Sequence, residues 1–494
     1  MSADANLKTL RILMIASEAD PLVKVGGLGD VAGSLPQALR ALPAEKIGGF
    51  TLDVRLAIPF HSVIRQKLPS PLPVASFSVP TPAGEIPGQV YLTRIGNTPV
   101  YLIEGAPIPP DAPVYNTTNP QQDAEKYLFF SLACLEAMRA LNWQPDILHA
   151  NDWHTALAVY QLHNIRQRDP FFKHTRSLLA IHNLPFLGGS AEKTLPAFGF
   201  QPSQDKRLPD WARSFPLPLG LSVADHIVAV SPNYAREILT PAFGCGLQDF
   251  LRTRINSISG ILNGLDQTLW DPANDTLIDH RFSLATLSDR VQNKLALQEQ
   301  LELPRDPNIP LLIAIGRMDQ QKGMDIAIEG LQMVTDQPWQ MVFLGTGDPL
   351  LESACRSLQA EFPDRVRAVI RFDLALSHRM YASGDILLMP SRYEPCGLAQ
   401  MIAMRYGCIP VARDTGGLHD TIQDTRQPNQ NTGFLFKDPL PSSFSVALLR
   451  ALALYHNHSA WNALQIRCMQ QDFSWTQSAI AYANIYFKLM EETQ

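Results

Sequence analysis

Lys24-Val25-Gly26-Gly27-Leu28-Gly29-Asp30 is the stretch that decides the fold of this chain. It follows an apolar run at residues 10–16, which predicts a buried parallel strand, and leads into an alternating segment at residues 31–42, which predicts a helix. A glycine turn between a strand and a helix exposes backbone N–H groups that can bind an anion. Lys24 adds a positive charge and Asp30 an acceptor for hydroxyl groups. The glycines can equally serve only to permit a tight turn.

The spacing of these glycines differs from that of a dinucleotide-binding turn. Gly27 and Gly29 are followed by Gly33, one residue later than G-x-G-x-x-G requires. The second expected strand ends at Ile58-Pro59, with no acidic residue to bind a ribose. Both observations argue against a dinucleotide-dependent oxidoreductase.

Length and composition describe a globular protein with room for two large domains. The 494 residues exceed what one hydrophobic core holds, and 46% of them are hydrophobic. A net charge of −6 without a long basic run argues against nucleic acid as a partner. The sequence has no apolar run of membrane-spanning length, no secretion signal, and no disulfide or metal pattern among its six cysteines. We therefore expect a cytoplasmic protein with no membrane partner.

Strand-like and helix-like segments alternate along the chain, the pattern of parallel sheets flanked by helices. The strands expected in the first half are residues 10–16, 52–58, 89–94, 99–103, 146–149, 178–182 and 225–230. The strands expected in the second half are residues 311–315, 339–344, 366–370, 385–389 and 409–412. We predict an α/β fold with two domains, residues 1–250 and 251–475. A C-terminal helix at 476–494 can dock on either domain and is assigned to the first.

Polar side chains stand where several of these strands end. Residues 146–154 read Asp-Ile-Leu-His-Ala-Asn-Asp-Trp-His, and His182-Asn183 follows the next strand. Ligands of parallel sheets bind beyond the carboxyl ends of the strands, so these side chains are expected to share one cleft. Taken singly, Asp152 can cap a helix, and His154 or His182 can be a hydrogen-bonded core histidine.

The second half repeats the arrangement with charged residues suited to a diphosphate. Arg317 and Lys322 stand between a strand and a helix, and Glu394 lies at a turn before residues 396–398, whose amides open another helix. Arg317 alone can also form an internal ion pair. Residues 413–417 form a further glycine turn. The chain contains neither a P-loop nor an Asp-x-Asp pair, so we expect no metal and no cofactor.

At these residues the chain resembles the bacterial glycogen (starch) synthases, which are retaining glucosyltransferases that use a nucleotide sugar. The resemblance runs from about residue 10 to about residue 480. It is carried by Lys24-x-Gly-Gly-Leu-x-Asp30, His149-x-Asn-Asp-Trp-His154, His182-Asn183, residues 224–232, Leu262-Asn-Gly-x-Asp266, Arg317-x-x-x-Gln-Lys-Gly323, Glu394-Pro-Cys-Gly-Leu398 and Arg413-x-Thr-Gly-Gly417. It implies two Rossmann-like domains facing across a cleft, the GT-B architecture, with ADP-glucose as the donor and an α-1,4-glucan such as glycogen as the acceptor.

The resemblance also implies roles for individual residues. Lys24 and the Gly26-Gly27 turn would lie near the donor phosphates, His182 at the reacting carbon, and Phe372 against adenine. The residues implied to be catalytic are Lys24, Asp152, His182, Asn183, Arg317, Lys322 and Glu394. Those implied to bind substrate are Gly26, Gly27, Asp30, Tyr115, His154, Asn263, Phe372, Cys396, Gly397, Leu398, Thr415 and Gly416.

The departures from the family pattern lie mainly on the acceptor side. Residues 185–188 read Pro-Phe-Leu-Gly where the family has a small residue followed by Tyr-Gln-Gly, and Pro218-Leu219 replaces a lysine and a small residue. Ile402 stands where a related signature has a second glutamate. Two alternatives therefore stay open: a transferase of the same fold with another acceptor, and a glucan-binding or regulatory protein without catalysis. Oligomeric state and the choice between ADP- and UDP-glucose are left open.

Overall fold

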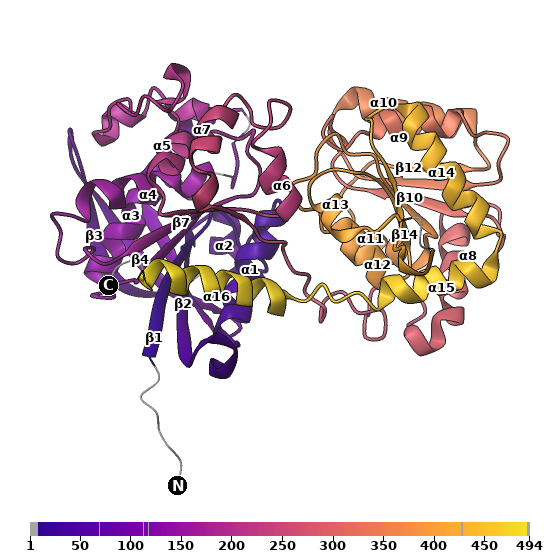
Figure 1. The fold of residues 1–494 in the computed structure, drawn as a ribbon, viewed down its shortest axis with the longest axis horizontal. Coiled ribbons are helices and arrows are strands. Elements are labelled where there is room, and N and C mark those ends of the chain that lie inside the picture. The colour runs from indigo at the N-terminus through magenta and orange to yellow at the C-terminus, as the bar shows by residue number, and fades with distance from the viewer. Residues whose placement is uncertain (1–7, 69, 112, 117, 426–427, 492–494) are drawn as a thin grey trace, which may run out of the picture. The chain divides into compact units, whose positions relative to one another are not determined.

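The computed structural model describes residues 8–68, 70–111, 113–116, 118–425 and 428–491. They form two compact units, one made of residues up to Gly264 together with those from Trp475 onward, and one made of Leu265–Ser474. Each is a sheet flanked by helices (Figure 1). None of the helices in the described ranges is both long and apolar enough to cross a bilayer.

Unit 1 contains a nine-stranded sheet in the order β3-β4-β5-β2-β1-β6-β7-β8-β9 within the described residues. Its strands are β1 (Lys8–Ile15), β2 (Phe50–Pro59), β3 (Leu72–Thr81), β4 (Gly84–Ile95), β5 (Thr98–Gly105), β6 (Ile147–Asn151), β7 (Arg176–Ile181), β8 (His226–Ala229) and β9 (Ile258–Gly260). Its helices are α1 (Gly27–Arg40), α2 (Ser62–Lys67), α3 (Pro120–Ala140), α4 (Trp153–Ile165), α5 (Pro216–Val223), α6 (Pro232–Glu237), α7 (Gln248–Thr253) and α16 (Trp475–Glu491).

Helix α1 packs its apolar stripe on the sheet and on α16 (Figure 1). Leu28, Val31, Leu35 and Leu39 recur at helical spacing and are buried. Helix α16 buries an aromatic stripe of its own in the same core, and the hydroxyl of Tyr486 lies 2.7 Å from Nδ1 of His149. The C-terminal helix thus belongs to unit 1, and the residues 492–494 expected in it lie outside the described ranges.

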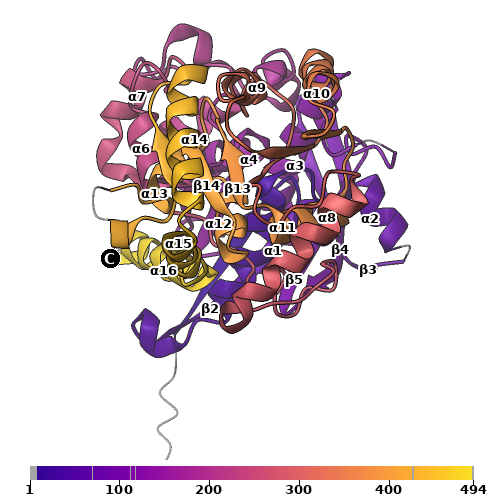
Figure 2. The ribbon, with the colours of Figure 1, turned by 90° about the vertical axis from the view of Figure 1, so that its right-hand side faces the viewer.

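Unit 2 is a parallel sheet in the order β12-β11-β10-β13-β14-β15. Its strands are β10 (Leu311–Ile315), β11 (Gln340–Leu344), β12 (Val366–Val369), β13 (Ile386–Met389), β14 (Ile409–Arg413) and β15 (Phe434–Phe436). Its helices are α8 (Arg290–Gln300), α9 (Met324–Gln332), α10 (Pro349–Glu361), α11 (Leu374–Ser383), α12 (Ala399–Arg405), α13 (Gly416–Thr421), α14 (Pro441–Tyr455) and α15 (His458–Met469). Helix α9 packs against α10 and α14, whereas α11 packs against α8 and α12 (Figure 2).

Several boundaries differ from those expected. The expected division at 250/251 falls inside α7, whereas the structure divides the chain after Gly264, because β9 pairs with β8 and extends the first sheet. Helix α1 begins at Gly27, four residues before the expected start, so Asp30 lies in its first turn. Strand β3 was not expected because it contains Pro73 and Pro80, which a strand at the edge of a sheet tolerates.

Candidate active site

In each unit several of the predicted residues lie where the strand order reverses, whereas Asn263 follows the edge strand β9 and Phe372 follows the edge strand β12. In unit 1, β1 pairs with β2 on one side and with β6 on the other. The strands β2 to β5 lie on the first side and β6 to β9 on the second. In unit 2 the equivalent neighbours are β10 and β13. Ligands of doubly wound sheets bind at this switch point, beyond the carboxyl ends of the two strands. The loops that leave β1, β6, β10 and β13 are therefore the candidate sites.

The glycine turn after β1 is built around a buried carboxylate. Glu18 is 1% exposed, and its carboxylate accepts hydrogen bonds from the backbone amides of Val25 and Gly26. Burial raises the pKa of Glu18, while these amides oppose the rise. Lys24 lies on the outer side of the turn, with Nζ 2.6 Å from the Asp30 carboxylate, and its side chain is 40% exposed. The amide of Gly26, expected near a phosphate, is thus already used within the protein.

Asp152 stands at the end of β6 in a backbone conformation with φ of +55°, which few residues other than glycine adopt. Although it occupies the N-cap position of α4, its side chain does not cap that helix. Its Oδ1 atom instead accepts from the amide of His182 at 2.7 Å and from that of Asn183 at 3.3 Å. Asp152 therefore fixes the backbone that follows β7. Burial raises its pKa to about 7.

His182 is a neutral, oriented side chain. Its Nε2 atom lies 2.8 Å from Oδ1 of Asn151, whose own amide nitrogen donates to the carbonyl of Ile15. Burial lowers the pKa of His182 to about 3. The imidazole is thus uncharged at neutral pH, and its orientation depends on Asn151. Asn151 is part of the sequence motif at residues 149–154, but no role was predicted for it.

His154 belongs to an aromatic cluster. Its ring lies 5.1 Å from that of Tyr115, 4.5 Å from that of Tyr127 and 4.3 Å from that of Trp153, measured between centroids. Burial lowers its pKa well below the usual value. The hydroxyl of Tyr115 lies 2.8 Å from Oγ of Ser17 and donates to Oε1 of Glu18 at 3.0 Å. Both residues expected to bind substrate therefore also support the walls of the site.

Two predicted amides present buried oxygens that have no hydrogen-bond partner among the described residues. They are Oδ1 of Asn183 and Oδ1 of Asn263. Asn263 is 6% exposed and lies just beyond β9. Buried polar atoms are nearly always paired in folded proteins. An oxygen left in this state suits a hydroxyl donor, which sugars supply.

In unit 2, Lys322 and Glu394 form an ion pair at the switch point. The Nζ atom of Lys322 lies 2.6 Å from Oε2 of Glu394, and Oγ of Ser391 donates to the same oxygen at 3.0 Å. The side chain of Glu394 is 6% exposed and that of Lys322 is 24% exposed. A lysine ammonium has three donors, so Lys322 can hold Glu394 and a further acceptor at once. Ser391 completes this cluster and was not singled out from the sequence.

Glycines bring the chain close to the backbone of Glu394. Gly416 has a φ of +45°, and a Cβ atom there would lie 1.9 Å from the carbonyl oxygen of Glu394. Thr415, which precedes it, is buried. Cys396 is buried too, and Gly397 has a φ of +73°. Leu398 is the N-cap residue of α12, so residues 396–398 do precede a helix as expected.

Arg317 and Phe372 are exposed in unit 2. The guanidinium of Arg317 contacts Asp319 at 3.1 Å and Gln321 at 3.3 Å, and its side chain is 61% exposed. Arg317 thus forms an ion pair within unit 2, the alternative given in the sequence analysis, but its guanidinium stays accessible to solvent. Phe372 is 87% exposed just after β12. Such an exposed aromatic ring is available to a planar partner.

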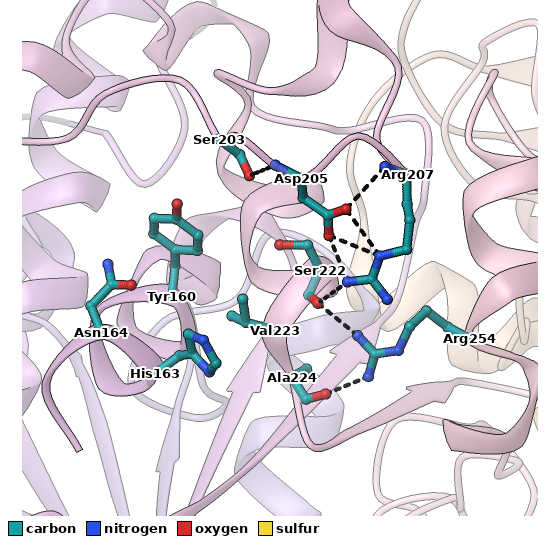
Figure 3. A pocket seen from close by; sticks show the side chains of 10 residues that line it. All are labelled: Tyr160, His163, Asn164, Ser203, Asp205, Arg207, Ser222, Val223, Ala224 and Arg254. Carbon is teal, nitrogen blue, oxygen red and sulfur yellow. Dashed lines mark hydrogen bonds and ion pairs between the residues drawn. The ribbon is translucent and has the colours of Figure 1, made fainter. Parts of the chain in front are cut away.

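A separate pocket of about 470 Å³ lies in unit 1, and none of the predicted site residues lines it (Figure 3). Its lining is Tyr160, His163, Asn164, Ser203, Asp205, Arg207, Ser222, Val223, Ala224 and Arg254. Arg254 donates to the carbonyls of Leu221, Ser222 and Ala224 at the end of α5, and Arg207 pairs with Asp205 at 2.6 Å. These arginines complete the end of a helix. Within the described residues no group of three His, Cys, Asp or Glu side chains is placed to hold a metal ion.

The fold and these two clusters define a glycosyltransferase, and comparison with known proteins identifies its class. The family described as "Starch synthase catalytic domain" matches residues 11–253, and "Glycosyl transferases group 1" matches residues 297–463. The chain has the GT-B fold: two doubly wound sheets, of which the second is parallel and the first is parallel except that β4 runs antiparallel to β3 and β5.

The chain belongs to the bacterial glycogen synthase family. It is 36% identical to the glycogen synthase of Clostridium perfringens over 98% of this chain and 99% of the relative. It is 39% identical to the glycogen synthase of an Anaeromyxobacter species over 97% of this chain and 99% of the relative. The catalytic domain of starch synthase IV from Arabidopsis thaliana, solved with ADP and acarbose, matches with a TM-score of 0.85 and 28% identity over 98% of this chain and 100% of that domain.

Proposed function

We propose that the protein transfers glucose from ADP-glucose to the non-reducing end of an α-1,4-glucan, with retention of configuration and without a metal. The observation that carries the proposal is the contact of Lys322 with Glu394 at the switch point of unit 2. It sets a cation and an acceptor for sugar hydroxyls side by side, which suits a sugar attached to a phosphate. The relative solved with ADP and acarbose supports a nucleotide donor and a glucan-like acceptor.

In unit 2, Lys322 and Arg317 would bind the diphosphate and stabilise the negative charge that grows on it as the bond to glucose breaks. Glu394, held by Lys322 and Ser391, would accept hydrogen bonds from the glucose hydroxyls. Phe372 would stack on the base. Lysine and arginine would then do the electrostatic work for which other transferases use a divalent cation.

In unit 1, His182 would border the reacting carbon and Lys24 the donor phosphates. The two buried carboxylates of this region, Glu18 and Asp152, both accept backbone amides. Both therefore hold backbone in place, and the proposed route uses neither as a nucleophile and forms no covalent glucosyl–enzyme. The acceptor hydroxyl would attack from the face that the diphosphate leaves, and the departing phosphate would take its proton.

The test is an assay of nucleotide release with ADP-glucose or UDP-glucose and with glycogen or maltooligosaccharides. We expect turnover with ADP-glucose and glycogen that survives EDTA, and an α-linkage in the product by NMR. Lys322→Ala should lower kcat by about ten- to a hundredfold, since a charge-assisted contact is worth roughly 1.5–3 kcal/mol. Lys437→Ala, an exposed lysine of the same unit, is the matched control. Normal turnover in Lys322→Ala, or a β-linked product, would contradict the proposal.

A further inference from the structure

The glycine turn after β1 encloses an anion that belongs to the protein. Oε2 of Glu18 lies 3.0 Å from the amide nitrogen of Gly26 and also accepts from the amide of Val25. A Cβ atom at Gly29 would lie 3.1 Å from the same oxygen, and one at Gly26 would lie 3.4 Å from Oε1. The carboxylate therefore fills the interior of the turn. A phosphate cannot take the Val25 and Gly26 amides while Glu18 holds them.

A side chain outside the turn also holds the carboxylate. Tyr115 donates its hydroxyl hydrogen bond to Oε1 of Glu18 at 3.0 Å, and the same oxygen lies 3.2 Å from the amide nitrogen of Gly26. The segment before Tyr115 is fixed by Lys126, which is fully buried and donates to the carbonyl of Val114 at 2.7 Å and to Asp123 at 2.6 Å. Helix α3 thus holds the backbone on which Tyr115 stands, and Tyr115 holds the Glu18 carboxylate that bonds the turn.

Closing a turn with a buried carboxylate is unfavourable unless hydrogen bonds offset the burial of the ionised group. The residue next to this turn is Lys24. Lys24 immediately precedes Val25, and the Lys24 Cγ atom lies 3.1 Å from where a Cβ of Gly29 would be. The backbone held by Glu18 is thus the backbone that presents Lys24.

We propose that Glu18 is a positioning residue for glucosyl transfer: its carboxylate fixes the Val25 and Gly26 amides so that Lys24 faces the donor diphosphate. This inference rests on the proposed function of Lys24 as a ligand of the donor. The sequence predicted that the amides of the turn bind an anionic ligand. In this proposal Lys24 binds the phosphate, and the amides of Val25 and Gly26 bind the Glu18 carboxylate.

Glu18→Gln tests this with little change of shape. The new NH2 group faces a backbone N–H whichever carboxylate oxygen it replaces, because Oε2 accepts from Val25 and Gly26 and Oε1 also accepts from Gly26. At least one amide contact is therefore lost, whereas the Tyr115 hydroxyl can turn and accept. We expect kcat/KM for ADP-glucose to fall by at least about tenfold, corresponding to about 1.4 kcal/mol. The KM for glycogen should stay within about twofold of the original, since the proposed contact of Lys24 is with the donor diphosphate and not with the glucan. Glu85→Gln, an exposed glutamate on the β4 strand, is the matched control.

A double-mutant cycle with Lys24→Ala shows whether Glu18 acts through the lysine. If it does, Glu18→Gln will have little further effect in the Lys24→Ala background. Two independent, multiplying losses would overturn the inference, and so would normal kinetics in Glu18→Gln. Equal losses for both substrates, accompanied by a lower Tm, would overturn it too, because they describe a structural role alone. Normal kinetics in Lys24→Ala would instead refute the proposed role of Lys24, which separates the two failures.

Discussion

Replacing Asp152 by asparagine should make the protein more stable at alkaline pH, although it weakens the active site. Burial raises the pKa of Asp152 from 3.8 to about 7. Its folded form therefore holds a proton that the unfolded chain has already lost between about pH 4 and pH 7. A raised pKa of this kind contributes stability at low pH, which is lost as the pH rises through the folded pKa. Asparagine has nearly the same shape and carries no charge to bury.

The size of the effect follows from the pKa difference. Each unit corresponds to about 1.36 kcal/mol, so ionising Asp152 in the folded state costs at most about 4 kcal/mol. The Asp152→Asn variant should match the original below about pH 4 and gain about 1.4 kcal/mol per pH unit between about pH 4 and pH 7, levelling off beyond pH 7. At pH 8, where Asp152 is ionised, kcat should fall by about tenfold, because a neutral amide holds the backbone amides of His182 and Asn183 less strongly than a carboxylate.

Urea unfolding at pH 5, 6, 7 and 8, followed by tryptophan fluorescence, measures this dependence. Asp249→Asn is the control: its side chain is 82% exposed, and the variant should show no trend with pH. A stability difference that is constant with pH would refute the reasoning. A variant less stable than the original at pH 8 would show that the His182 and Asn183 amides hold Asp152 ionised in spite of its burial.

Three further substitutions separate binding from folding. Phe372→Ala should leave Tm unchanged, because the ring is 87% exposed, and should raise the KM for ADP-glucose several-fold; an unchanged KM would remove its role at the base. Gly416→Ala should lower Tm and activity together, since its Cβ would overlap the carbonyl of Glu394, and a normal thermal scan would contradict this. Tyr486→Phe should destabilise unit 1 by about 1 kcal/mol through the lost contact with His149, measurable by urea unfolding, with kcat retained.

The sequence predicted the elements that have a strong local apolar pattern. It missed the short strands that form only because a neighbouring strand offers hydrogen bonds. Strand β10 is a continuous apolar run and β1 is apolar from Ile12 onward, which local pattern identifies. Strand β9 has three residues and exists because β8 offers it a partner. The first domain therefore extends beyond its expected end. Short edge elements depend on tertiary contacts that no local pattern records.

The same distinction applies to the site. Lys322 and Glu394 were both singled out from sequence, and the reversal of strand order between β10 and β13 explains why they meet. Glu18 and Asn151 were missed as contributors, because each acts on another part of the protein rather than by standing at an expected ligand position. The signal that could have revealed Glu18 is its place between a buried strand and a glycine turn, where a charge requires a partner.

The anion-binding capacity of a helix start is thus used differently in the two units. In unit 1 the turn before α1 is occupied by Glu18, so a cationic side chain, Lys24, is left to meet an incoming negative group. In unit 2 the acidic residue is Glu394, and its carboxylate is paired with Lys322 and Ser391. Both arrangements place a lysine beside a carboxylate that fixes its surroundings. An ammonium held in this way loses little freedom when it meets a phosphate, and such preorganisation makes an electrostatic contact effective in a transition state.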